Sequence, residues 1–243
     1  MRYLIVLFAF LIHIANAKTI IAKYNVTYGV FGRVGTAVAK LETNATNYKI
    51  EIEVATAGLA KILSGNRREH YVSEGFIRNG VFVPRFFEKI KESKKRRDDK
   101  KYVFDHIHKK VIVTTDKNKY GVFHVHVTHP LNYYAKDDLL TLYFNLKNYF
   151  KPSRTKYRFY AVGGNETDGA VDIEILRHPG KIKKLMGVDG TYLRVLLHHK
   201  IFASKKGELY IVLDKDGVTK KGLLKDVIFF GDIVGKLVGK QEY

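Results

Sequence analysis

The stretch YKIEIEV, residues 48–54, alternates apolar and charged side chains without a break. Successive side chains of a β-strand point to opposite faces, so this alternation is typical of a strand that is buried on one side only. The apolar residues that would share the buried face are Tyr48, Ile50, Ile52 and Val54. A half-buried strand of this kind needs a sheet beside it and a core behind it.

Similar β-rich or alternating stretches recur along most of the chain. They cover residues 19–28, 34–42, 69–73, 82–92, 101–107, 111–115, 122–127, 156–162, 170–176, 192–198, 208–213 and 223–229. Short turns separate them, including a charge-dense turn after Glu92, a turn at residues 116–120 and a hairpin at Asp216-Gly217. The pattern predicts a mainly β protein, with residues 18–243 forming a single antiparallel curved sheet or barrel-like domain.

Two helices are predicted to cover this sheet, at about residues 57–64 and 138–149. The first carries apolar residues at helical spacing and stops at Gly65. The second begins at Asp137 or Asp138, either of which can cap it, and has an apolar and aromatic stripe that continues almost to Pro152.

The N-terminus predicts export. Arg2 precedes an apolar run, and Ala15-Asn16-Ala17 is a small-residue cleavage site, so residues 1–17 are interpreted as a signal peptide; a retained anchor helix is the alternative. The chain has no cysteine, which excludes disulfides and a lipoprotein anchor on the first mature residue. We expect an exported protein of the bacterial periplasm that begins at Lys18.

The charge of the chain suggests anionic partners. The formal net charge is +19, and removal of Arg2 with the signal peptide leaves 19 − 1 = +18. Outside the cytoplasm the abundant polyanions are lipid headgroups, lipopolysaccharide phosphates and acidic glycans, so no nucleic acid is expected. The alternative explanation of the positive charge is that basic proteins are common in the proteome of the host, so that the charge indicates no particular partner.

The order of several short motifs resembles the domain-of-unknown-function family 3108 of exported bacterial proteins. These motifs are Tyr24-x-Val26-x-Tyr28-Gly29 with Gly35, Glu69-x-Tyr71, Val83-Pro84-Arg85-Phe86, Tyr102-x-Phe104-Asp105 and the run from Asp137 to Tyr143. Asp138 stands where the family is expected to carry a proline. The resemblance implies a β-rich, curved or barrel-like domain similar to lipocalins or periplasmic lipid carriers, and it supplies no functional residue.

Histidines at alternate positions are the candidate metal ligands. His124 and His126 share one face of a strand, and His106 and His108 repeat this spacing about one strand earlier. Two imidazoles at positions i and i+2 can share zinc or copper if the two strands pair. The alternative is a solvated polar face, because no acidic residue accompanies the pair at 124 and 126.

Two further features are candidate surface sites. Lys94, Lys95, Arg96 and Arg97 form the centre of a basic tip that could dock onto an anionic membrane or lipopolysaccharide, or else simply protect a strand edge. Asn44 lies in an Asn-x-Thr sequon with Glu42 two positions before it, which makes it a candidate glycan site in a host that uses the extended bacterial sequon.

No catalytic motif is present, so the sequence predicts a non-enzymatic protein without a cofactor. The first hypothesis is a binding or carrier protein for a lipid or other apolar ligand. Its candidate pocket wall is Leu59, Ile62, Leu63, Leu142, Tyr143 and Leu146. The alternative is an envelope structural or interaction protein whose β interior is filled and whose basic face binds an acidic protein or glycan. The sequence indicates no particular oligomeric state.

Overall fold

The computed structural model describes residues 17–165, 167–198, 204–227 and 231–243, with Val30, Leu59 and Leu63 described by their backbone alone. The fold is one sheet of fifteen strands in the order β8-β7-β6-β5-β4-β3-β2-β1-β15-β14-β13-β12-β11-β10-β9. The order begins at β8 and ends at β9, so the sheet is not closed. The predicted mainly β, barrel-like fold is confirmed.

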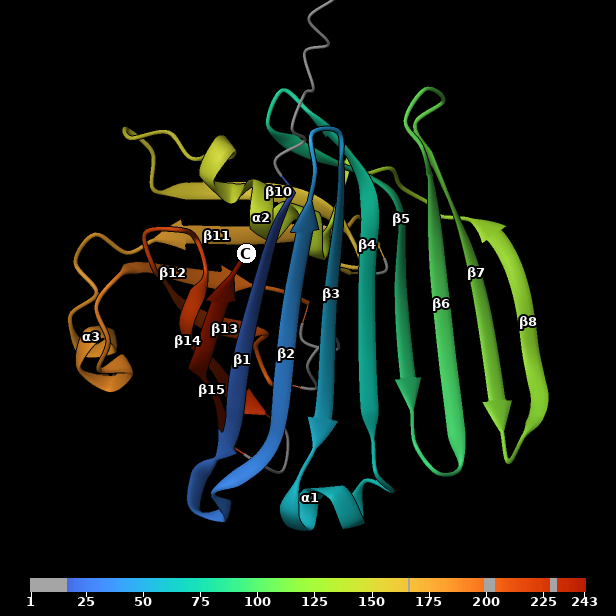
Figure 1. Ribbon diagram of the computed structural model, residues 1–243, viewed down its shortest axis with the longest axis horizontal. Helices are drawn as coiled ribbons and strands as arrows, with labels where there is room; N and C mark the ends of the chain where they lie inside the picture. Colours follow the sequence, from blue (N-terminus) through green and yellow to red (C-terminus); the bar gives the residue numbers. More distant parts are fainter. Residues whose placement is uncertain (1–16, 166, 199–203, 228–230) are drawn as a thin grey trace, which may run out of the picture.

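The N-terminal half of the sheet is a meander of eight long strands (Figure 1). They are β1 (Lys18–Tyr28), β2 (Arg33–Thr43), β3 (Asn47–Thr56), β4 (Arg68–Arg78), β5 (Val81–Glu92), β6 (Arg96–Asp105), β7 (Lys110–Lys119) and β8 (Val122–Pro130). A short 3-10 turn, η1 (Gly29–Phe31), joins β1 to β2, and α1 (Gly58–Leu63) joins β3 to β4.

The C-terminal half continues from the other side of β1. Its strands are β9 (Asp137–Asp138), β10 (Lys156–Val162), β11 (Ala170–Ile175), β12 (Thr191–Leu196), β13 (Glu208–Leu213), β14 (Thr219–Val227) and β15 (Gly231–Glu242). Every neighbouring pair in the sheet is antiparallel except β9 with β10, which is parallel. The two halves meet where β15 pairs with β1, from Ile20 opposite Glu242 to Tyr28 opposite Ile233.

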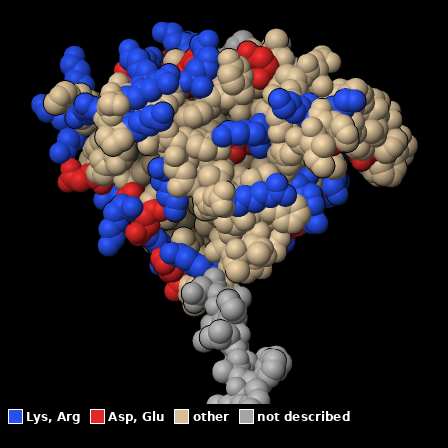
Figure 2. Space-filling view, turned by 90° about the horizontal axis from the view of Figure 1, so that it is seen from above, with Lys and Arg blue, Asp and Glu red and all other residues tan. Residues whose placement is uncertain are grey.

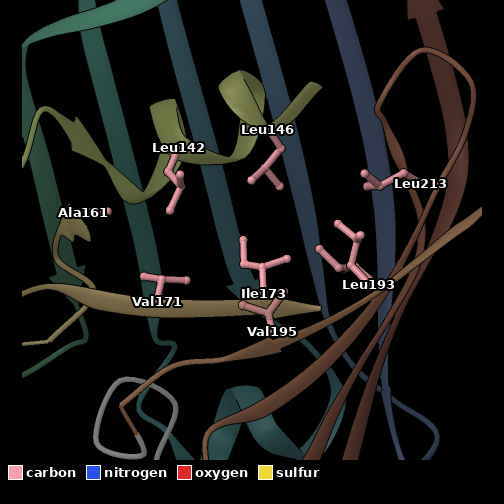
Figure 3. Close-up of a cluster of buried hydrophobic side chains, with 9 residues drawn as sticks. Leu142, Leu146, Ala161, Val171, Ile173, Leu193, Val195 and Leu213 are labelled. Carbon is pink, nitrogen blue, oxygen red and sulfur yellow. The ribbon is translucent and has the colours of Figure 1, made fainter. Parts of the chain in front are cut away.

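The core lies between the two halves of the sheet, around α2 (Leu139–Tyr149). Strands β10–β12 cross behind the upper part of β1–β4, with α2 between them (Figure 1). Leu142 and Leu146 point from α2 toward Val171 and Ile173 of β11 and Val195 of β12 (Figure 3). The helix α3 (Lys181–Met186) covers the outer face of β12–β14 through Met186. Within the described residues, no helix is long and apolar enough to cross a membrane.

The structure corrects two local expectations and adds two elements. Residues 116–119 belong to β7 and pair with β8, so the turn is Tyr120-Gly121, where both residues have positive φ. The charge-dense segment is strand from Arg96 onward. Its first two residues, Arg96 and Arg97, are both exposed although they point to opposite faces, so the usual alternation of a half-buried strand is absent here. The strand β15 and the helix α3 were not predicted at all. The predicted helices at 57–64 and 138–149 are confirmed as α1 and α2.

Candidate ligand-binding face

The start of α2 is fixed by a capping box. Asp138 is the N-cap, and its Oδ1 accepts hydrogen bonds from the backbone N–H of Leu140 at 2.7 Å and of Thr141 at 3.0 Å. In return the Thr141 hydroxyl accepts from the Asp138 backbone N–H at 2.8 Å. This arrangement satisfies donors that a helix N-terminus otherwise leaves unpaired. The sequence allows Asp137 or Asp138 as the cap; the structure uses Asp138, and this cap holds α2 against the sheet.

The carboxylate of Asp138 also joins the helix to the inner face of the sheet. Its Oδ2 accepts a hydrogen bond from the Ser73 hydroxyl of β4 at 2.6 Å, and Ser73 lies 3.1 Å from the Tyr48 hydroxyl of β3. Asp138 is fully buried, and burial raises its pKa to about 6. A carboxylate without water loses hydration that these few hydrogen bonds only partly replace.

A second buried carboxylate lies beside the first. Asp137 accepts hydrogen bonds from the Asn145 amide at 2.8 Å and from the Tyr149 hydroxyl at 3.0 Å, and burial raises its pKa as well. The Asn145 Oδ1 also accepts a hydrogen bond from the backbone N–H of Phe82 at 2.8 Å, and its Nδ2 donates one to the Phe82 carbonyl at 2.9 Å. Pairing between β5 and β6 begins only at Phe86, so Asn145 takes the place of the missing strand partner.

Because of these anchors, α2 fills the upper interior of the curved sheet. Leu142 and Leu146 are each only 3% exposed, and Tyr143 donates a hydrogen bond to the Gly217 carbonyl at 2.7 Å. Leu142 and Leu146 belong to the hydrophobic core and Tyr143 packs against it, and their role as a pocket wall stays a prediction. Ile62 is 75% exposed on α1 and lines no interior. The side chains of Leu59 and Leu63, also predicted for that wall, lie outside the described residues.

Below α2 the inner face of the sheet stays apolar but is only half buried. Alternation and register place the following residues on it, all of intermediate exposure: Val26, Ala37, Ala39, Ile52, Val54, Leu224 and Ile233. We call this set the lower inner face. By contrast, Ile50, on the same face of β3 but next to the helix end, is fully buried. The sheet is thus longer than the helix that covers it, and it leaves an apolar surface toward α1.

The inner face changes character from β4 toward β8. Four lysines share it across β5, β6 and β7, and we call them the cationic strip: Lys89, Lys91, Lys100 and Lys117. Lys89 Nζ lies 5.4 Å from the centre of the Phe87 ring and 5.5 Å from that of Tyr102. The register places Glu69 and Asp98 on the same face, both opposite Lys91, so four lysines stand beside two carboxylates. An apolar surface beside a cationic one suits an amphiphile with an acidic head.

An open cleft of ≈ 440 Å³ lies at the opposite end of the sheet, beside the turn between β2 and β3. Its charged wall is balanced, since Lys49 Nζ is 3.6 Å and Arg85 Nη2 is 3.8 Å from the carboxylate of Glu74. Asn44 borders this cleft, and its side chain accepts the backbone N–H of Thr46 and of Asn47, as in a tight turn. Glycosylation of Asn44 stays a prediction.

The histidine pairs do not meet. His106 lies in the turn after β6, where its ring nitrogens are 2.8 Å from the Tyr134 hydroxyl and 2.6 Å from the Pro84 carbonyl oxygen. His108 in the same turn pairs with Asp105, whereas His126 on β8 pairs with Asp116. His124 is exposed on β8. The described part of the chain contains no group of three or more residues that could hold a metal ion. The prediction that the four histidines could converge on one metal ion was therefore wrong.

The basic tip lies where the sequence placed it, at the connection between β5 and β6. Lys94, Lys95, Arg96 and Arg97 are all exposed. Two of these charges have local partners, because Arg96 lies 2.8 Å from Asp98 and Arg97 lies 3.5 Å from Asp99. The two lysines therefore carry most of the unbalanced charge of the tip.

An unclosed antiparallel sheet that curves around one helix defines this protein as a β-barrel-like domain. The same description applies to a solved structure, that of the beta-barrel-like protein of domain of unknown function DUF1849 from Brucella abortus. The two superpose with a TM-score of 0.55 over 93% of this chain and 98% of that chain, at 13% sequence identity, so the likeness concerns the fold.

The family follows from the sequence itself. The family model described as protein of unknown function DUF3108 matches residues 23–238, and the chain belongs to this family. The resemblance drawn from the short motifs is thereby confirmed. The chain has no match among the curated proteins. Neither comparison indicates a catalytic family.

Sequence reasoning missed the lower inner face and the cationic strip. The alternation of β3 placed Ile52 and Val54 on the buried side, in the same group as Ile50. Their partial exposure depends on where α2 ends in space. The lysines of the strip were visible only as part of a charge-dense stretch, and their shared face depends on the register of β5, β6 and β7.

Proposed function

We propose that the protein is a non-enzymatic binding or carrier protein for a lipid or another apolar ligand, and that it works in the bacterial periplasm after residues 1–17 are removed. The lower inner face is the observation that carries this proposal, because it offers apolar surface that α2 does not cover. The cationic strip supports it, since it lies on the same face and suits an acidic head group.

Several features of the described chain favour binding over catalysis. Both buried carboxylates are engaged in hydrogen bonds that hold α2, and Ser73 donates to one of them. None of these groups has the arrangement of a nucleophile beside a base with an open substrate position. The filled upper interior limits the ligand to the lower inner face.

A ligand-binding assay with a matched pair of variants tests the proposal. The probe is a fluorescent fatty acid, and the variant is Ile52→Glu, which places a carboxylate on the lower inner face. The control is Val103→Glu, at a position 45% exposed on the outer face of β6. We expect at least a tenfold loss of affinity for Ile52→Glu and an unchanged affinity for the control, both variants retaining the circular dichroism of the parent.

Native mass spectrometry of protein purified from its own compartment provides the second arm. A co-purifying lipid that is released by organic solvent would support the carrier function. If no lipid is found and both variants bind the probe as the parent does, the carrier proposal fails. The alternative of an envelope interaction protein that binds an acidic protein or glycan would then take its place.

A further inference from the structure

One end of the N-terminal half of the sheet is a continuous rim. Four connections lie there, at the bottom of Figure 1: residues 29–32, 57–67, 93–95 and 120–121. Backbone hydrogen bonds tie the elements at this end together, from Ala57 N–H to the Val34 carbonyl at 2.7 Å, from Lys94 N–H to the Gly65 carbonyl at 2.9 Å, and from Tyr120 N–H to the Lys95 carbonyl at 2.9 Å. We call this end the basal rim.

Large apolar side chains project from the basal rim into solvent. The connections and the first residues of β8 carry five of them, each exposed by 60% or more: Phe31, Ile62, Tyr120, Val122 and Phe123. In the three turns at the other end, residues 44–46, 79–80 and 106–109, the one strongly exposed large apolar side chain among the described residues is Ile107. Exposed apolar side chains concentrated at one end of a domain mark an interaction site.

The connections of the basal rim carry only basic charge. They contain Lys61, Arg67, Lys94 and Lys95 and no acidic residue, and Arg67 pairs with Glu69 at the start of β4. Lys95 Nζ lies 5.8 Å from the centre of the Tyr120 ring, so the two side chains form a cation–π contact. Lysine and arginine are also spread over the opposite end of the molecule (Figure 2). Basic charge alone therefore does not distinguish the rim, whereas basic charge together with exposed aromatic side chains does.

This combination matches the surface of a bilayer better than the surface of a protein. The five apolar side chains come from three tips: Phe31 from residues 29–32, Ile62 from α1, and the other three from the hairpin between β7 and β8. Lys94 and Lys95 lie on the connection between the last two tips. A lipid interface accepts each side chain separately, because aromatic rings dissolve at headgroup level while lysines remain beside the phosphates. Anionic lipid adds attraction for each lysine near the surface.

We propose that the basal rim docks onto the surface of a bilayer that contains anionic lipid, with Phe31, Ile62, Tyr120 and Phe123 entering the headgroup layer. The inference extends the proposed function, because the lower inner face reaches this same rim through Val26 and Val54. Docking would thus place the apolar inner face directly against the lipid, although the docking itself needs no bound ligand.

Tryptophan fluorescence reads out this geometry directly, since the chain has no tryptophan of its own. Phe123→Trp and Ile62→Trp put a single reporter on the basal rim, and Tyr160→Trp puts one on β10 at a position 48% exposed. Each is mixed with vesicles of phosphatidylcholine alone or enriched in phosphatidylglycerol. We expect a blue shift for both rim reporters with the anionic vesicles, and none for the β10 reporter.

A charge-matched pair of variants tests the electrostatic part. Lys94→Ser with Lys95→Ser removes two charges from the rim, and Lys181→Ser with Lys184→Ser removes two from α3. The rim pair should bind anionic vesicles about 30-fold more weakly in a sedimentation assay, because each lysine contributes about fivefold, and the α3 pair should bind within about twofold of the parent.

Three results would overturn the docking proposal: equal shifts for rim and β10 reporters, vesicle binding that the rim pair leaves unchanged, or binding to lipopolysaccharide or an acidic protein without binding to vesicles. The two proposals fail separately. A protein that co-purifies with lipid but ignores vesicles keeps the carrier function and loses the docking surface, and a protein that docks but carries no lipid does the reverse.

Discussion

Burial of Asp138 should make acidification stabilise this part of the fold. The folded-state pKa of about 6 lies above the ordinary value of 3.8, because burial penalises the charged form. Between these two values the folded chain binds a proton that the unfolded chain has released. This group therefore adds stability at low pH and loses that contribution as the pH rises through about 6.

The size of the effect follows from the two pKa values. Moving from about pH 7.5 to about pH 4.5 protonates most of the folded Asp138 while the unfolded carboxyl stays mostly charged, which corresponds to roughly 2 kcal/mol in favour of folding. Carboxylates in ion pairs act in the opposite direction, so the total pH profile of the protein mixes both signs. The contribution of Asp138 is isolated by comparison with a variant that cannot titrate there.

The variant is Asp138→Asn. Its amide oxygen can still accept from Leu140 and Thr141, and its amide nitrogen can donate to the Ser73 hydroxyl, so the cap survives. Urea unfolding, followed by far-UV circular dichroism, gives the free energy of unfolding of both proteins at the two pH values. We expect the parent to gain roughly 2 kcal/mol more than the variant on acidification.

Asp172→Asn is the control with the opposite sign. Hydrogen bonds from Arg158 at 2.7 and 2.8 Å hold the pKa of Asp172 below its usual range, so its contribution is present near neutral pH and disappears as the pH falls. The pair is partly exposed, and the effect should be small. Parallel pH profiles for the parent and Asp138→Asn would refute the reasoning about burial.

Three other substitutions address the architecture through the same unfolding assay. Asn145→Leu should cost about 2–3 kcal/mol, because the backbone N–H and carbonyl of Phe82 on β5 lose the partner that the buried Asn145 amide provides. The control Asn148→Ala, at an exposed position, should cost less than about 1 kcal/mol, and equal costs would contradict the role given to Asn145. Leu146→Ala should cost about 2–5 kcal/mol by opening a cavity around α2, and a cost below about 1 kcal/mol would show that the helix is loosely packed. Gly75→Ala should destabilise by more than about 1 kcal/mol, since its Cβ would lie 2.0 Å from the Val83 carbonyl oxygen, whereas Gly235→Ala meets nothing within 4 Å and should change stability little.

Features with a local cause could be predicted from the sequence. The alternation from Tyr48 to Val54 depends on the period of a strand, and the start of α2 depends on a single capping residue, Asp138. Both are present in the structure as expected. The family resemblance was also correct, because the order of short motifs is a property of the chain and needs no knowledge of packing.

Features that depend on contacts between segments far apart in the chain could not be predicted from the sequence. The strand β15 contains glycines at 231, 235 and 239, which break the alternation, and its main partner β1 lies at the other end of the chain. The exposure of Ile52 depends on where α2 ends, and the separation of His106 from His126 depends on which end of β7 each one faces. Such outcomes follow from register and packing between remote segments.

The pairing of β1 with β15 has a consequence for how the chain folds. These strands are the seam between two meanders, and Thr19 and Tyr243 exchange backbone hydrogen bonds of 3.0 Å in both directions. A contact between residues so far apart in sequence requires the closure of a very long loop, which slows folding. Until β15 docks, the chain consists of two separate sheets with four open edges in place of two, each a template for pairing with another molecule. The pairing of β15 with β1 is therefore the step that removes two of these four edges.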